Sequence, residues 1–122
     1  MSWNNYPALG ECCYTETLPN GLRLRVVPKP GFAGKFAFLG VNFGSCDTKL
    51  PLSGGWQTVP DGTAHFLEHR MFCLPGCDPE AEFSRLGAES NAFTDYAMTG
   101  YYFTCTDRFD DCLRLLLRMV LT

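Results

Sequence analysis

Both histidines of this 122-residue chain stand in one short segment, His65-Phe66-Leu67-Glu68-His69. On a helix, residues four apart lie on one face, so the two imidazoles can converge on a single ion. Two neutral imidazoles suit Zn²⁺, and Glu68 stands beside the same face. A carboxylate that is not itself a ligand can take the proton from a metal-bound water, which then becomes a nucleophile near neutral pH. The spacing therefore predicts a zinc site with Glu68 as its general base.

The element that must carry this motif is a predicted helix over residues 62–72. Asp61 is its expected N-cap, and Pro75-Gly76 is expected to end it. Three apolar side chains can pack this helix onto a sheet: Ala64, Leu67 and Met71. The motif therefore falls on the kind of element that its chemistry requires.

Two further helices are expected. Asp78 can cap a short one that begins at Pro79 and stops at Gly87. A longer one follows Asp107 as its possible cap, and no Gly or Pro closes it before Thr122. Apolar residues recur along it at three-and-four spacing, which predicts a wide buried stripe: Phe109, Cys112, Leu113, Leu116, Leu117, Val120 and Leu121.

The remaining elements are predicted strands. Residues 14–18 lead into Asn20-Gly21, a strong tight-turn signal, and the alternation over residues 22–26 predicts a strand with one buried face. The apolar run at residues 36–43 predicts a strand buried on both faces, and residues 44–60 predict a loop. Strands are also expected at residues 90–96 and 101–106. The second should direct three side chains to one face: Tyr101, Phe103 and Cys105.

Length and composition exclude several classes of protein. The chain has room for one compact domain, and 46% hydrophobic with 19% charged residues is a globular balance. A net charge of −3 gives no basic footprint for nucleic acid. No apolar run is long enough to cross a membrane. The first six residues show no secretory signal, so we expect a cytoplasmic protein.

Seven cysteines are many for this length, and their odd number argues against a disulfide framework. We expect mostly reduced thiols that pack as small hydrophobic side chains. Cys73 lies one turn after His69, so a further hypothesis is that it competes for zinc or is oxidised near the site.

The segment from Gly62 to Phe72 resembles the inverted zinc motif of the pitrilysin and insulinase family of metallopeptidases. Other segments resemble the family in the same order along the chain: Asn20-Gly21-Leu22 with Val26-Val27-Pro28, Gly44-Ser45-Cys46-Asp47, and residues 83–94. The likeness runs from about residue 18 to the end. It is greatest to bacterial processing-peptidase-like members. With the predicted elements, it implies an α+β fold: a two-layer sandwich of a mostly antiparallel sheet packed against helices.

The resemblance also implies roles for single residues. His65 and His69 are zinc ligands, and Glu68 is the general base of a metalloendopeptidase that hydrolyses peptides. An extended peptide substrate adds as another strand along an edge strand, formed by Asn91, Ala92, Phe93 and Thr94.

This sequence departs from the family in one respect. The family's third zinc ligand is a Glu roughly seventy residues beyond the second His, and Thr122 comes before that position. We therefore expect residues 1–122 to be the N-terminal part of a peptidase catalytic domain, inactive alone. By type only, five residues could replace the missing ligand: Cys73, Cys77, Glu82, Glu89 and Asp95.

Two alternative functions remain open. The synthase that cleaves S-ribosylhomocysteine also carries His-x-x-Glu-His, with a Cys as its third ligand, and Cys105 or Cys112 could take that part. A peptidase-like chain can also serve as a non-catalytic subunit that pairs with a homologous active partner. The intact motif His65, Glu68 and His69 favours an active parent protein.

Overall fold

The structure is a computed structural model that describes residues 2–121, and these divide into two compact units on either side of the boundary between Phe32 and Ala33. The first unit contains three strands and a short 3-10 turn. The second contains five strands and three helices, including the helix that carries the histidine motif.

The first unit is an antiparallel sheet in the order β1-β2-β3. Its elements are β1 (Ser2–Tyr6), the turn Pro7–Leu9, β2 (Glu11–Thr17) and β3 (Arg23–Val26). The predicted turn between β2 and β3 is confirmed. Gly21 has a φ of 86°, and the Leu22 N–H donates to Asn20 Oδ1 at 3.1 Å. An Asn side chain that accepts from a following N–H is a common way to stabilise such a turn.

The prediction that β3 buries one of its faces is wrong within this unit. Leu24 and Val26 are 41% and 44% exposed. The described residues of this unit, 2–32, contain no α-helix that could cover the sheet. Alternation in a sequence indicates which residues share a face without indicating what lies over it.

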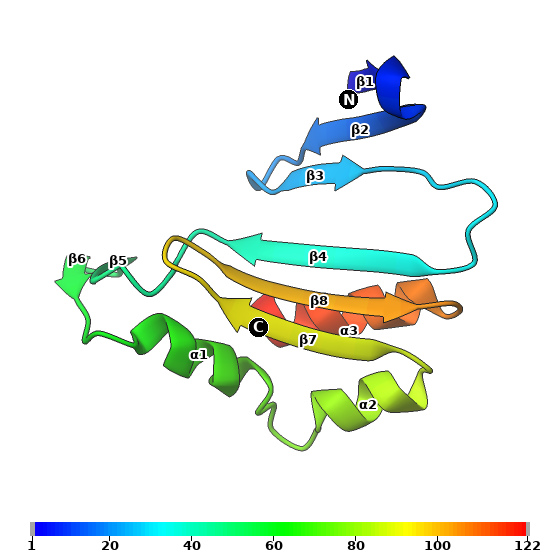
Figure 1. The fold of residues 1–122 in the computed structure, drawn as a ribbon. Helices are drawn as coiled ribbons and strands as arrows, with labels where there is room; N and C mark the ends of the chain where they lie inside the picture. The colour runs from blue at the N-terminus through cyan, green and yellow to red at the C-terminus, as the bar shows by residue number, and fades with distance from the viewer. Residues whose placement is uncertain (1, 122) are drawn as a thin grey trace. The chain divides into compact units, whose positions relative to one another are not determined.

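The second unit is built on an antiparallel sheet in the order β4-β8-β7, in which β8 pairs with both neighbours (Figure 1). Its strands are β4 (Lys35–Val41), β7 (Glu89–Thr94) and β8 (Thr99–Cys105), and its helices are α1 (Thr63–Met71), α2 (Pro79–Arg85) and α3 (Phe109–Leu121). The helices contact β7, β8 and β4. The predicted two-layer α+β architecture is confirmed.

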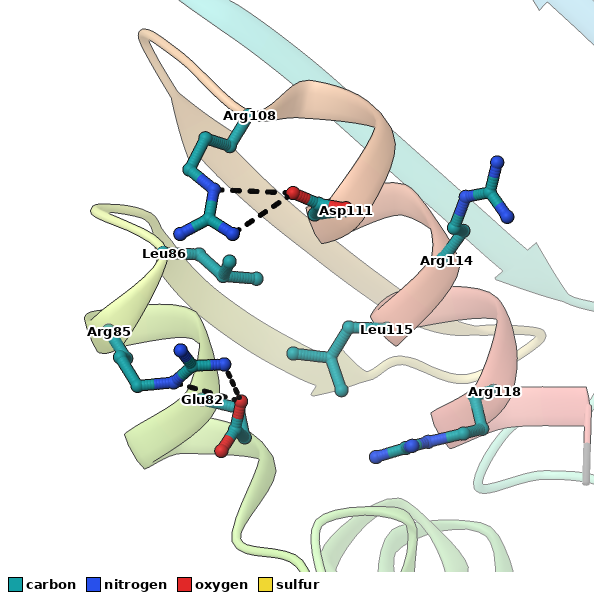
Figure 2. Close-up of a pocket in the computed structure, with 8 residues that line it drawn as sticks. All are labelled: Glu82, Arg85, Leu86, Arg108, Asp111, Arg114, Leu115 and Arg118. Atoms are coloured by element: carbon teal, nitrogen blue, oxygen red, sulfur yellow. Dashed lines mark hydrogen bonds and ion pairs between the residues drawn. The ribbon is translucent and has the colours of Figure 1, made fainter.

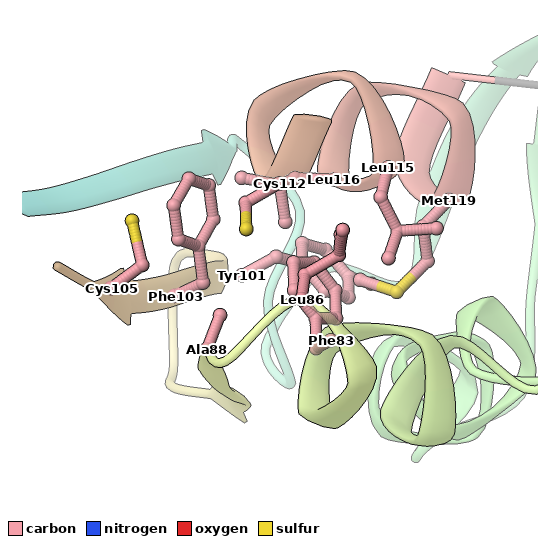
Figure 3. Close-up of a cluster of buried hydrophobic side chains, with 10 residues drawn as sticks. All are labelled: Phe83, Leu86, Ala88, Tyr101, Phe103, Cys105, Cys112, Leu115, Leu116 and Met119. Carbon is pink, nitrogen blue, oxygen red and sulfur yellow. The ribbon is translucent and has the colours of Figure 1, made fainter. Parts of the chain in front are cut away.

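The core of the second unit lies between β8 and the helices α2 and α3 (Figure 3). Phe103 of β8 is fully buried against Phe83 of α2, with ring centroids 5.7 Å apart. The prediction that Tyr101, Phe103 and Cys105 share one face of β8 is confirmed, and all three are buried. On α3 the buried stripe is centred on Cys112, Leu115, Leu116 and Met119. It therefore overlaps the predicted stripe, whereas Leu121 is 62% exposed.

The opposite face of this sheet carries exposed aromatic side chains, so the prediction that residues 36–43 are buried on both faces is wrong. Phe36 is 60% and Phe38 44% exposed. Phe38 stacks on Phe93 of β7 with centroids 6.1 Å apart. Their rings lie over Gly100 of β8, where a Cβ atom would come within 2.5 Å of Phe38. A continuous apolar run does not reveal whether one or both faces are covered.

The ends of the helices agree only in part with the sequence. Asp78 caps α2 as predicted, since its Oδ1 accepts from the Ala81 N–H at 3.2 Å. Asp61 does not cap α1. The N-cap is Gly62, with a left-handed φ of 82° and no side-chain cap bond.

The segment predicted as a loop over residues 44–60 contains a small hairpin, with β5 (Lys49–Leu52) paired to β6 (Gly55–Thr58). Gly54 and Gly55 at its turn both have positive φ angles, which glycine adopts without steric cost. Among the helices of residues 2–121, none has the length and apolar character needed to cross a membrane.

Candidate metal centre

The two histidines of α1 converge as their spacing predicts. Both side chains are exposed, and their Nε2 atoms lie 3.1 Å apart. Two nitrogens bound to one tetrahedral zinc at about 2.0–2.1 Å lie about 3.3 Å from each other. The pair therefore fits two of the ligand positions of a zinc ion with little movement of either ring.

Glu68 lies on the same helix but is buried, with 9% of its surface exposed. Its Oε2 accepts a hydrogen bond from the Thr94 hydroxyl at 2.6 Å, across the contact between α1 and β7. A buried carboxylate needs such a partner, because an ion removed from water without one is costly.

Tyr101 of β8 also lies beside this carboxylate. Its side chain is 4% exposed. Burial raises the pKa of Tyr101 to about 12, and the nearby negative charge of Glu68 acts in the same direction. The phenol of Tyr101 therefore stays neutral at neutral pH.

A hollow of about 270 Å³ opens beside the motif between α1, the start of α2 and β7. It is lined by Glu68 and His69, together with Phe72, Asp78, Glu80, Asn91 and Ala92. The hollow brings the predicted base and one predicted ligand together with two of the four predicted substrate-binding residues.

The four predicted substrate-binding residues lie on β7 from Asn91 to Thr94. In the sheet order β4-β8-β7, β7 pairs only with β8, so its other edge is open within the second unit as described. An open edge offers backbone groups to an added strand. On this strand the Ala92 N–H donates to the side-chain Oδ1 of Asn91 at 2.8 Å.

Within residues 2–121, no group of three His, Cys, Asp or Glu side chains is placed to hold a metal ion. The five residues considered as substitutes for the third ligand therefore do not complete the site. Cys73 is exposed, and its thiol contacts the carbonyl of His69 at 3.7 Å. Cys105 and Cys112 are buried in the hydrophobic core. Neither forms a group of three potential metal ligands with the two histidines.

A second hollow, also of about 270 Å³, lies between α2 and α3 (Figure 2). It is lined by Glu82, one of the five candidate substitutes for the third ligand, and by none of the predicted zinc ligands, base or substrate-binding residues. Leu86 and Leu115 form its apolar part. Figure 2 shows ion pairs within each helical segment, Arg85 with Glu82 at 2.8 Å and Arg108 with Asp111 at 3.2 Å. These exposed pairs contribute little to stability.

Sequence reasoning missed several residues near the motif. It assigned Thr94 only to a substrate-binding strand and did not connect Tyr101 with Glu68. The alternation of β8 was a usable signal for Tyr101, because it placed that side chain on the same face as Phe103 and Cys105. No sequence signal pointed to Phe72 or Glu80 as lining residues.

Comparison with known proteins gives a consistent result for this arrangement of motif and fold. The family model described as insulinase, peptidase family M16, matches residues 57–121. The uncharacterized zinc protease YmfH of Bacillus subtilis (strain 168) is 39% identical over 117 residues, which cover 94% of this chain and 27% of that protein. The core protein I of the mitochondrial ubiquinol-cytochrome-c reductase complex of Euglena gracilis is 32% identical over 97 residues, covering 74% of this chain and 17% of that protein.

A solved structure agrees with these matches. The crystal structure of an M16-like peptidase from Alicyclobacillus acidocaldarius superposes with a TM-score of 0.85 and 35% identity, over 92% of this chain and 26% of that one. The α+β fold of this chain is thus shared with a solved M16-like peptidase, and the sequence is similar to that of a protein described as a zinc protease. The chain belongs to the insulinase family, peptidase family M16. It spans about a quarter of the length of the zinc protease and the peptidase structure that it matches.

Proposed function

We propose that this chain supplies the zinc-binding helix and the substrate strand of a metalloendopeptidase that hydrolyses peptide bonds. One observation carries the proposal: two imidazole nitrogens 3.1 Å apart on α1, with the buried carboxylate of Glu68 on the same helix. His65 and His69 would hold Zn²⁺. When bound, zinc supplies Lewis acidity and lowers the pKa of a coordinated water.

Other residues of the chain would transfer the proton and bind the substrate. Glu68 accepts a proton from the attacking water and passes it on to the leaving amine, a role for which a positioned carboxylate is suited. The edge of β7 from Asn91 to Thr94 binds the peptide as an added strand. Backbone pairing of this kind gives affinity without requiring one substrate sequence.

The test uses the full-length protein with its zinc content measured. Glu68→Gln should retain zinc and lower kcat for peptide hydrolysis by about 10²–10⁴-fold, because it removes proton transfer and keeps the shape of the side chain. His65→Ala should lose both zinc and activity, and a chelator should abolish activity until zinc is restored. Full activity of Glu68→Gln would contradict the assigned base.

We also propose that residues 1–122 form only part of the catalytic domain and have no peptidase activity alone. The support is that two imidazoles make an incomplete catalytic zinc site, which ordinarily has three protein ligands. Robust cleavage by the 122-residue chain that is abolished by Glu68→Gln would contradict the proposal that these residues are inactive alone. It would still support Glu68 as the general base.

A homologous peptidase-like subunit is the proposed partner, supported by the similarity to a core protein of a respiratory complex. If the chain instead comes from a non-catalytic subunit, the purified full-length protein should contain no zinc.

A cytoplasmic location remains a prediction. The seven free cysteines are consistent with a reducing compartment, and cell fractionation would test it.

A further inference from the structure

We propose that Thr94 is a positioning residue for Glu68: its hydroxyl fixes the carboxylate of the base in register with the strand that binds the substrate. This inference rests on the proposed peptidase function and adds a role for a side chain that the motif does not contain.

The first support is the geometry of the hydrogen bond. Thr94 Oγ1 donates to Glu68 Oε2 at 2.6 Å, which is within the range of a well-formed hydrogen bond from a hydroxyl to an oxygen. The bond joins residues 26 positions apart and is partly buried. A β-branched side chain has few rotamers, so Thr94 presents its hydroxyl in a fixed direction.

The second support is the chemical nature of the partner. A glutamate has several rotatable bonds and, on a helix, no fixed direction of its own. A hydroxyl holds it through one oxygen and leaves its charge intact, whereas an Arg or Lys partner would bring a full opposite charge to the base. Oε1 then remains the oxygen that takes a proton. Tyr101, on the strand next to β7, is buried near this carboxylate.

The third support is the place of Thr94 in the sheet. It is the last residue of β7, the strand whose open edge is proposed to pair with the peptide. The same strand therefore sets the position of the substrate backbone and of the base. Such a link matters because a misplacement of about 1 Å in a reacting geometry costs about 10²-fold in rate.

The experiment compares Thr94→Val with Thr94→Ser in the full-length zinc-loaded protein. Valine keeps the branched shape and removes the donor, and serine restores the donor. Thr94→Val should lower kcat by about 10- to 100-fold with KM and zinc content unchanged. Thr94→Ser should recover activity to within a few-fold of the parent. Unchanged kcat in Thr94→Val, or a failure of Thr94→Ser to recover it, would overturn the proposal.

Thr99 offers a matched control on the neighbouring strand, directly opposite Thr94. It is buried, and its hydroxyl donates to the carbonyl of Phe43 at 2.8 Å rather than to the base. Thr99→Val should lower the melting temperature and leave kcat of the folded fraction unchanged. An equal loss of kcat in both variants would reduce the role of Thr94 to ordinary packing and overturn the proposal.

A second readout does not depend on activity. A crystal structure of the zinc-free Thr94→Val protein should show the Glu68 carboxylate displaced from its position beside β7, and the Thr94→Ser structure should show it in place. An undisplaced carboxylate would overturn the positioning role. If the parent protein cleaves no peptide but this displacement is seen, the proposed function fails while the structural link stands.

Discussion

Tyr101 shows how one buried side chain makes stability depend on pH. Burial raises its pKa in the folded chain to about 12, compared with about 10 for an exposed tyrosine. The folded state therefore holds the phenol proton more tightly than the unfolded state. The resulting stabilisation is complete below about pH 10 and is lost as the pH rises towards about 12.

Tyr101→Phe should remove this component. Urea unfolding between about pH 9 and about pH 12 should show a steeper loss of unfolding free energy in the parent chain than in the variant. The buried thiol of Cys112, whose pKa is also raised mainly by burial, is present in both chains and cancels in the comparison. Equal slopes would show that the phenol is not held neutral by its surroundings.

Also at the scale of single residues, the sequence predicted part of the candidate metal centre and missed part. The four-residue spacing of His65 and His69 was sufficient to predict that their side chains converge, because residues four apart on a regular helix lie on the same face. The hydrogen bond from Thr94 to Glu68 could not be predicted from the sequence, because it depends on the packing of α1 against β7 and not on any local pattern.

Among the helices, the first turns of α1 and α2 give contrasting predictions for two aspartates. Asp78 accepts from the Ala81 N–H and caps α2, whereas the N-cap of α1 is Gly62, with no side-chain cap bond. Asp78→Ala should lower the unfolding free energy by about 1 kcal/mol, and Asp61→Ala should change it by less than about 0.5 kcal/mol. Urea unfolding of both variants checks this pair. A loss in Asp61→Ala as large as that in Asp78→Ala would contradict the capping assignment.

The same contrast explains why the sequence predicted one cap correctly and the other incorrectly. Asp78 precedes Pro79, whose fixed φ favours the first helical position, so the capping geometry is locally set. Asp61 precedes Gly62, and a left-handed glycine starts α1 one residue later than the aspartate would require. The prediction for β4 failed for a similar reason. Its apolar run does not indicate whether helices cover one face of the strand or both.

For the whole molecule, burial is distributed very unevenly between the two units. Every member of the hydrophobic core lies in the second unit, and no described residue of the first unit is buried. A chain that begins at Ala33 should therefore unfold cooperatively on its own. Residues 1–32 alone should give little stable sheet, because a small sheet without a covered face is marginal in water.

Circular dichroism melts of the two pieces check this prediction. Leu116 provides a control within the second unit, since it is 1% exposed. Leu116→Ala should cost about 2–5 kcal/mol and lower the melting temperature of the piece that begins at Ala33. A non-cooperative melt of the unmodified second unit would show that its core is insufficient alone.

The aromatic face of β4 has a practical consequence for anyone who prepares the second unit alone. In that unit β4 is a terminal strand of seven residues, and Phe36 and Phe38 on it are exposed. A long, apolar strand with unpaired backbone groups is a template for joining other copies edge to edge. Self-association should therefore limit the solubility of such a preparation, and a lysine in place of Phe36 would be a rational way to keep it monomeric.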